Sequence, residues 1–289
     1  MKKFLVVFFS LLVASAAFAQ HSMELNHGNG SAQPANGFAG SGGGSQNLIF
    51  HNGGVVIRNA HVVCIFWGPS FNGGSDASYA SGIQAFRNQF GTTGEYNTIT
   101  QYYGNDALSG YGNIAQANLG GGSADWFDTS TPPQNVTDAI VQGEVRAYLQ
   151  THATDYNAIY EVFIPATSFS SSGSQGSCGA TGGVTLAYCA YHSHYVDGTN
   201  NNVKYSIEPY PSCSGCSASG FTTVQNQEHF VCHESREAVT DALGNAWFDR
   251  RGNEADDKCA WSPAPFIGTG GFGYQYEWSN ANSGCIQTR

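Results

Sequence analysis

Short, almost continuously apolar runs predict the strands of a central sheet. Residues 61–68 and 158–164 carry few polar side chains, which is typical of strands that are buried on both faces. Residues 183–194 and 203–209 lie on either side of a turn at Asn201, and this arrangement predicts a hairpin. The sheet is therefore expected to combine segments that lie far apart in the sequence.

Apolar residues at helical spacing predict three helices. They cover residues 78–90, residues 138–149 with Thr137 as N-cap, and residues 222–243. Residues 97–103 are expected to form a further strand. The element order predicts an α+β or α/β domain with a mixed β-sheet flanked by helices. The last long helix follows the sheet, an order shared with many zinc-peptidase (zincin-like) domains.

The N-terminal part of the chain carries an export signal. A basic start, a short apolar run and an Ala-Phe-Ala pattern predict a signal peptide over residues 1–19. Residues 20–46 are rich in Gly, Ser and Asn, so we expect a disordered linker there. A single domain is expected over residues 47–289. No later apolar run approaches the ~20 residues of a membrane span, so a secreted or periplasmic location is predicted.

The charge balance limits the classes of partner. Eleven basic residues stand against twenty-one acidic ones. Nucleic acids and anionic membrane surfaces both require a basic footprint, so neither is expected as a partner. An acidic chain is compatible with a cation site built from carboxylates.

Eight cysteines in an exported chain are expected to form disulfides. Spacing favours Cys178–Cys189, Cys213–Cys216 and Cys259–Cys285, among about 105 possible pairings. Cys64 and Cys232 are then left, and they can pair if the first buried strand lies beside the last helix. CxxC spacing can also serve redox chemistry or metal binding. Because no second CxxC is present, a small structural loop is the preferred interpretation of this motif.

The last predicted helix carries the residues that indicate chemistry. Side chains four apart lie one turn above each other, which places four possible metal ligands in one stripe. The stripe consists of His229, His233, Glu237 and Asp241. It is ~18 Å long at ~1.5 Å per residue, so only two adjacent members can hold one ion.

His233 and Glu237 have the architecture of the His-Glu-x-x-His zinc helix, with a carboxylate as the second ligand. In that arrangement the residue after the first ligand, here Glu234, accepts a proton from the metal-bound water. A catalytic zinc site usually has three protein ligands, and Glu254 or Asp257 is expected to supply the third. The carboxylate that does not ligate is expected to orient His233.

Other interpretations of these residues remain open. The stripe can be a solvated helix face, and its carboxylates can bind calcium instead of zinc, or no metal. His192 and His194 share one face of a predicted strand, where they can join the metal site, stabilise an oxyanion or simply form hydrogen bonds. A serine hydrolase is not supported, because the Gly-x-Ser-x-Gly elbow is missing.

Several motifs occur in a fixed order along the chain. They are FHNGGV at 50–55, VVCIFWG at 62–68, CAYHS at 189–193 and HESREAVTD at 233–241, followed by Glu254, Asp257 and Cys259. Together they resemble the EXORDIUM, or phosphate-induced, protein family, with its "HGGP…V.LIWYG", "CGYHS" and "HE..E..TDP…EI.D.C" motifs. The resemblance covers residues 47–289, and the chain looks like a bacterial-type member of the family.

The resemblance implies an exported, single-domain protein. Plant members are apoplastic or cell-wall proteins without a settled biochemical activity. The chain departs from the family pattern at Ala242, where the family has Pro, and at residues 255–256, which replace an apolar-Gly pair. The second departure adds a carboxylate and leaves the choice among Glu254, Asp256 and Asp257 open.

The sequence therefore predicts a secreted zinc-dependent hydrolase, a metallopeptidase that acts on peptide or cell-wall substrates. The alternative is a non-catalytic extracellular or cell-wall-associated binding protein with a structural metal or none. The two hypotheses differ in the role of Glu234: the enzyme requires its carboxylate as the general base, whereas the binding protein does not.

Overall fold

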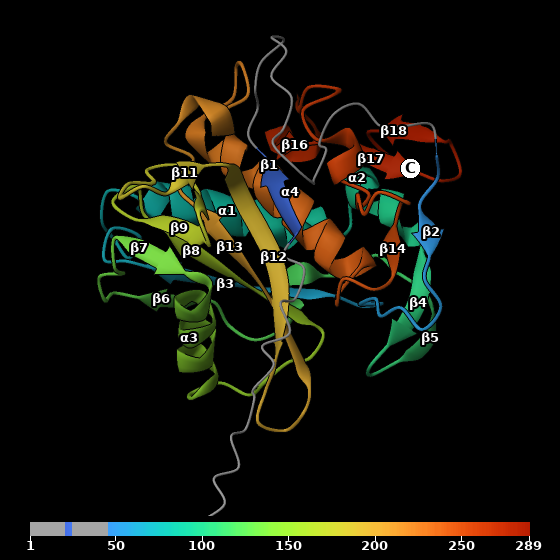
Figure 1. The fold of residues 1–289 in the computed structure, drawn as a ribbon, viewed down its shortest axis with the longest axis horizontal. Coiled ribbons are helices and arrows are strands. Elements are labelled where there is room, and N and C mark those ends of the chain that lie inside the picture. Colours follow the sequence, from blue (N-terminus) through green and yellow to red (C-terminus); the bar gives the residue numbers. More distant parts are fainter. Residues whose placement is uncertain (1–20, 25–45) are drawn as a thin grey trace, which may run out of the picture.

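A six-stranded mixed sheet runs through the centre of the molecule (Figure 1). The computed structural model describes residues 21–24 and 46–289. The strand order is β1-β12-β13-β8-β3-β6, with parallel pairing from β13 to β6 and antiparallel pairing of β12 with β13 and with β1. The strands are β1 (His21–Glu24), β3 (His61–Trp67), β6 (Trp126–Asp128), β8 (Ala158–Ile164), β12 (Tyr188–Val196) and β13 (Asn202–Pro209).

Helices cover both faces of this sheet (Figure 1). The α-helices are α1 (Ala77–Phe90), α2 (Gly94–Asn97), α3 (Asp138–Leu149) and α4 (Thr223–Thr240). Successive β3 residues alternate between two cores: Cys64 and Phe66 pack in the core with α1 and α4, whereas Val63 and Ile65 pack in the core with α3. Burial on both faces explains the continuous apolar runs of β3 and β8.

Short strand pairs and 3-10 turns fill the long connections. The remaining strands are β2 (Ile49–Phe50), β4 (Tyr103–Asp106), β5 (Gly110–Asn113), β7 (Asn135–Thr137), β9 (Phe169–Ser172), β10 (Gln175–Gly176), β11 (Thr185–Leu186), β14 (Trp247–Phe248), β15 (Phe266–Ile267), β16 (Gly273–Tyr274), β17 (Glu277–Ser279) and β18 (Gly284–Ile286). The 3-10 turns are η1 (Thr98–Gln101), η2 (Leu119–Gly121), η3 (Ser214–Cys216), η4 (Asp257–Cys259) and η5 (Thr269–Gly271).

The mixed sheet flanked by helices confirms the predicted α+β class, and the three predicted helices and the hairpin are present. The strand expected over residues 97–103 is wrong, because α2 and η1 occupy most of this segment. The Thr93 hydroxyl accepts a hydrogen bond from the Tyr96 amide at 3.2 Å. This N-cap favours a helical turn over an extended chain.

Helix α4 is buried almost along its whole length. Thr222 and Gln225 form a capping box at its start, and Asp241 ends it by accepting hydrogen bonds from the amides of Asn245 and Ala246 at 2.5 and 2.6 Å. The helix packs against β16, against α1 and against the sheet strands β12 and β13, and every residue of 226–240 is buried. The interpretation of the polar stripe as a solvated face is therefore wrong.

The expected signal peptide lies outside the described residues, as does most of the linker at 20–46. Residues His21–Glu24 of that linker form β1, whose backbone pairs with the edge of β12 in the register His21↔His192. In the described ranges, no helix is long and apolar enough to cross a membrane.

The disulfide Cys259–Cys285 is confirmed and ties the last strand to η4. The expected Cys64–Cys232 bond is wrong, since both residues are buried free thiols. Both thiols lie in the core shared by α1 and α4, but their charged neighbours differ: Arg87 and Asp125 for Cys64, and Arg236 and Asp256 for Cys232. Spacing in the sequence does not reveal that the two thiols stay apart within one core.

Two further disulfides cross in a way that spacing did not predict. Cys178 bonds to Cys213 and Cys189 bonds to Cys216, so both expected pairs in this region are wrong. The two CxxC cysteines flank the single turn η3, which packs beside β12. The turn is therefore linked to the preceding chain at Cys178 and at Cys189. Because all four cysteines are in disulfides, they are not available as metal ligands.

Candidate metal centre

A row of polar side chains crosses the sheet beneath α4. His192 on β12 pairs with Ser206 on β13, Ser206 pairs with Glu161 on β8, and Glu161 pairs with Cys64 on β3. Residues opposite each other on neighbouring strands share one face of a sheet. The Ser235 hydroxyl of α4 donates to the Glu161 carboxylate at 2.6 Å, so the helix docks on this row through polar contacts.

The predicted ligand pair forms on α4. His233 Nε2 and Glu237 Oε2 are 3.1 Å apart, and both side chains are fully buried. Asp257 Oδ1 lies 3.7 Å from His233 Nε2, and the Asp257 amide donates to Glu237 Oε1 at 2.9 Å. These three side chains form a group whose possible ligand atoms all lie within 4.8 Å of one another. Asp257, rather than Glu254, therefore lies where a third ligand is expected.

A second group meets the first at Glu237. His192 Nε2 lies 3.6 Å from Glu237 Oε2 and 3.3 Å from Glu254 Oε2. The possible ligand atoms of His192, Glu234 and Glu237 also lie within 4.8 Å of one another. Of the two strand histidines, His192 thus reaches the centre, and Glu254 lies on its side of Glu237.

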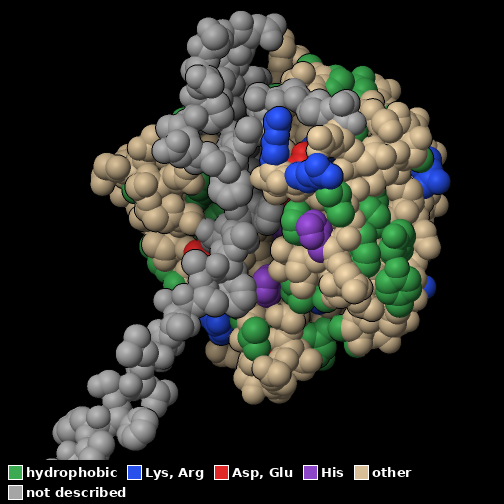
Figure 2. All heavy atoms as spheres, turned by 45° about the vertical axis from the view of Figure 1, so that its right-hand side comes forward, with side chains coloured by type: hydrophobic (Ala, Val, Ile, Leu, Met, Phe, Trp, Pro, Cys, Tyr) green, Lys and Arg blue, Asp and Glu red, His purple; other side chains and the backbone are tan. Residues whose placement is uncertain are grey.

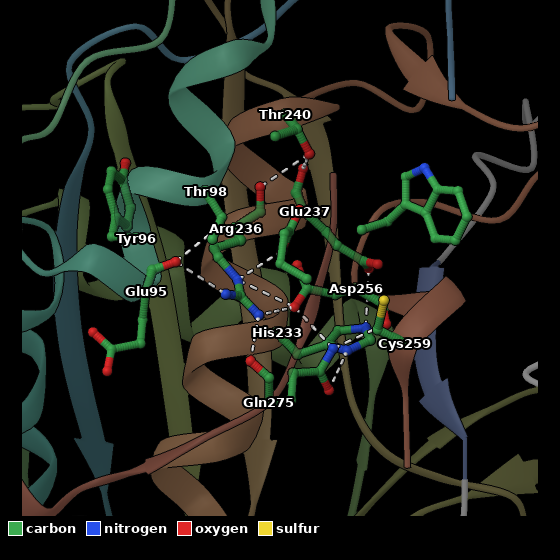
Figure 3. Close-up of polar contacts among 12 residues, drawn as sticks. Glu95, Tyr96, Thr98, His233, Arg236, Glu237, Thr240, Asp256, Cys259 and Gln275 are labelled. Atoms are coloured by element: carbon green, nitrogen blue, oxygen red, sulfur yellow. Dashed lines mark hydrogen bonds and ion pairs between the residues drawn. The ribbon is translucent and has the colours of Figure 1, made fainter. Parts of the chain in front are cut away.

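Gln275 orients His233, a role that the sequence assigned to a carboxylate. The Gln275 amide nitrogen donates to the Asp256 backbone and side-chain oxygens at 2.9 and 2.8 Å. Its amide oxygen therefore faces His233 Nδ1, 3.3 Å away, and accepts a hydrogen bond from that nitrogen (Figure 3). This arrangement turns Nε2 towards the ligand group, where loss of its proton would make its lone pair available to a metal.

Arg236 explains why Asp256 does not join the centre. The guanidinium forms a buried ion pair with Asp256 Oδ1 (Figure 3). It forms another with Glu277 Oε2 at 2.8 Å. A third contact, from Arg236 Nη1 to the Glu95 carbonyl oxygen, is 3.2 Å long. Of the three downstream acids, Asp256 is therefore occupied by Arg236 and is not a candidate ligand.

Three accessory candidates have other surroundings. His229 lies among aromatic rings, with its ring centroid 4.8 Å from Trp261 and 4.7 Å from Phe230. Asp241 caps the end of α4 through the two backbone amides described above. His194 pairs with Lys204 across the hairpin, and burial together with the nearby positive charges lowers its pKa to about 4. None of the three belongs to the groups at Glu237 among the described residues.

The protonation of the centre reflects its burial. Burial raises the pKa of Glu234 to about 8, although the two histidines oppose this shift. Burial also disfavours ionised Glu237, but His233 and His192 keep the pKa of this carboxyl well below its usual range. Burial lowers the pKa of both histidines, yet the surrounding carboxylates raise it well above the ordinary value. A divalent cation would replace protons here.

Buried acidity is a property of the whole domain. Thirteen acidic side chains among the described residues are buried, and the face in Figure 2 shows few acidic atoms. Both Glu234 oxygens lack a hydrogen-bond partner within the described part of the chain. Buried ionised groups require a counter-charge. The centre thus has the donor set and the excess of negative charge that fit a divalent cation.

The centre is nearly closed to solvent. His192 is 4 % exposed, the side chain of Asp257 is 19 % exposed, and the other four side chains are fully buried. Asp257 is therefore the member of the centre that is most exposed to solvent. Comparison with known protein families, with curated proteins and with solved structures finds no match for this chain.

Proposed function

We propose that the protein is an exported zinc-dependent hydrolase, a metallopeptidase with a zincin-like active-site helix. His233, Glu237 and Asp257 hold the ion, and Glu234 is the general base. The observation that carries this proposal is the convergence of these side chains around Glu237 Oε2, with Gln275 fixing the metal-binding tautomer of His233.

A bound zinc ion would supply Lewis acidity, lowering the pKa of a coordinated water to about 7 and polarising a carbonyl oxygen. The residues of the chain provide the proton transfer. Glu234 has two carboxylate oxygens without hydrogen-bond partners among the described residues, so either can accept a proton from the attacking water. The same carboxyl then returns this proton to the leaving amine.

Strand β1 supports a peptide as the substrate. Its backbone pairs antiparallel with β12, with His21 opposite His192 and Ser22 opposite Tyr191. The edge of β12 therefore accepts an extended main chain beside the centre, as in peptide recognition by strand addition. A cell-wall peptide is one candidate substrate, in line with the resemblance to the EXORDIUM family.

The disulfides support export. Three of them occur in the described domain, and such bonds persist in oxidising compartments. A secreted or periplasmic location follows from this proposal and from the sequence signal.

The second candidate is a non-catalytic extracellular or cell-wall-associated binding protein. The nearly complete burial of the centre favours it, because structural metal sites are closed whereas catalytic sites keep an open position. In that protein, Glu234 would be a structural acid without a role in turnover.

Replacing Glu234 by Gln separates the two candidates. We expect Glu234→Gln to lose at least about 10²-fold in hydrolysis of an unfolded protein substrate while retaining its metal, because only the proton acceptor is removed. Glu144→Gln is a matched control, since Glu144 is buried on α3 and burial raises its pKa to about 8 as well. Metal content is measured by mass spectrometry on the same samples.

Full hydrolysis by Glu234→Gln would contradict the proposed base. Wild-type protein that holds metal but does not cleave unfolded proteins or cell-wall peptides would favour the binding protein.

A further inference from the structure

Glu237 is shared by two groups of possible ligands. On one side lie His233 and Asp257, and on the other lie His192 and Glu234. Glu254 extends the second side, because its Oε2 is 3.3 Å from His192 Nε2. Both histidine Nε2 atoms lie close to the same Glu237 oxygen, Oε2, so this oxygen has the position of a bridging ligand in a two-metal site.

The distances on the second side are also those expected between ligands of one ion. His192 Nε2 forms a long hydrogen bond of 3.3 Å with Glu254 Oε2 and lies 3.6 Å from Glu237 Oε2, whereas charge-assisted N–H···O bonds measure about 2.7–2.9 Å. A ring nitrogen carries one proton and cannot donate well to both. Tetrahedral ligands at about 2.0–2.1 Å from an ion are about 3.3–3.4 Å apart, close to both observed values.

The negative charge of the centre also favours a second cation. The centre holds four carboxylates, Glu234, Glu237, Glu254 and Asp257, and the nearby buried Arg236 is paired with Asp256 and Glu277. Once metal binding has displaced the protons of the centre, one divalent ion balances two of these four negative charges. Glu234 is fully buried, its oxygens have no hydrogen-bond partner among the described residues, and one of them lies within 4.8 Å of the ligand atoms of His192 and Glu237. An unpartnered buried carboxylate in this position indicates a cation beside it.

We propose that the centre binds two divalent transition-metal ions, bridged by Glu237. The first ion is held by His233 and Asp257, and the second by His192 and Glu254. Glu234 stays next to the second ion, within reach of a water between the two. This inference rests on the proposed metal-dependent function and deepens it, because two ions would stabilise both the attacking and the leaving atom of a hydrolysis.

Zinc stoichiometry tests the second site. The metal-free, full-length mature protein with its disulfides intact is dialysed to equilibrium against Zn²⁺, and bound metal is counted by mass spectrometry. We expect about two zinc ions per wild-type chain and about one in His192→Asn and in Glu254→Gln. His194→Asn is the matched control: it lies on the same strand face two residues along, and we expect it to retain both ions.

A second readout does not depend on variants. Wild-type protein loaded with Mn²⁺ is expected to give a spin-coupled electron paramagnetic resonance signal, because the ions share one carboxylate. Signals of isolated Mn²⁺ only would overturn the bridged site, even if a variant failed to fold.

The outcomes separate this inference from the proposed hydrolase. One zinc per wild-type chain, retained in His192→Asn, would overturn the second site and leave the hydrolase standing. One zinc that is lost in His192→Asn would overturn the two-ion arrangement and make His192 a ligand of a single ion. No zinc in the wild type would overturn both proposals.

Discussion

At the scale of single residues, the centre depends on side chains that hold the ligands as much as on the ligands themselves. Gln275 fixes the His233 tautomer, and Asp256 fixes Gln275 through two hydrogen bonds. Arg236 in turn pairs with Asp256. The sequence identified the ligand candidates, but not this chain of contacts, because Gln275 lies 42 residues after His233. The only feature of the sequence that points to Gln275 is that it is a single amide side chain within a segment rich in aromatic residues.

We expect Gln275→Ala to weaken zinc binding by about 10- to 100-fold, the usual cost of losing a group that orients a metal ligand. Without the hydrogen bond from Nδ1 to Gln275, the ring of His233 would no longer be held in the orientation and tautomer in which Nε2 can bind the metal. Competition with a fluorescent chelator measures the affinity. Gln287→Ala, which removes a hydrogen bond to the exposed side of Tyr276, is the control and should bind zinc like the wild type. Equal affinity in both variants would refute the orienting role.

At the scale of elements, α4 combines a metal-binding side with a polar attachment to the sheet. Helical spacing alone predicted the His233–Glu237 pair, because residues four apart on a helix are neighbours. The same reasoning grouped His229 and Asp241 with this pair. In the structure, however, His229 packs against Trp261, and Asp241 caps the end of the helix. His192 joined the centre through strand pairing, which depends on the register of the hairpin.

Glu161 links α4 to the sheet and makes stability depend on pH. Burial raises its pKa to about 8, against the ordinary value of 4.5 that applies when the chain unfolds. The folded state therefore keeps a proton that the unfolded state has released, and this contribution to stability falls as pH rises from about 4.5 to about 8. We expect the free energy of unfolding of Glu161→Gln to fall less over this range than that of the wild type.

Denaturant unfolding of the metal-free protein at several pH values measures this difference. Glu95→Gln is a suitable control, since Glu95 is also buried but lies in α2, away from the sheet. Parallel pH profiles for the wild type and Glu161→Gln would contradict the assignment.

At the scale of the whole molecule, the three layers and the disulfides place distant segments around Glu237. The C-terminal segment supplies Asp257 and Gln275, and its disulfide Cys259–Cys285 starts at the last residue of η4. Local patterns predicted β3, β8, the hairpin of β12 and β13, the three long helices and this one disulfide, whereas the strand expected over residues 97–103 was wrong. They could not predict the crossed pair Cys178–Cys213 and Cys189–Cys216, because many pairings are compatible with one spacing.

Whether His233 holds a metal is the central question, and zinc content answers it most directly. Mature wild-type protein, His233→Asn and His229→Asn are purified in parallel and analysed by mass spectrometry, with circular dichroism to confirm folding. His229 lies one turn away on the same helix, among aromatic rings. We expect zinc in the wild type and in His229→Asn, and a loss of at least about one ion per chain in His233→Asn. Folded wild type without zinc, or His233→Asn with as much zinc as the wild type, would contradict the metal centre.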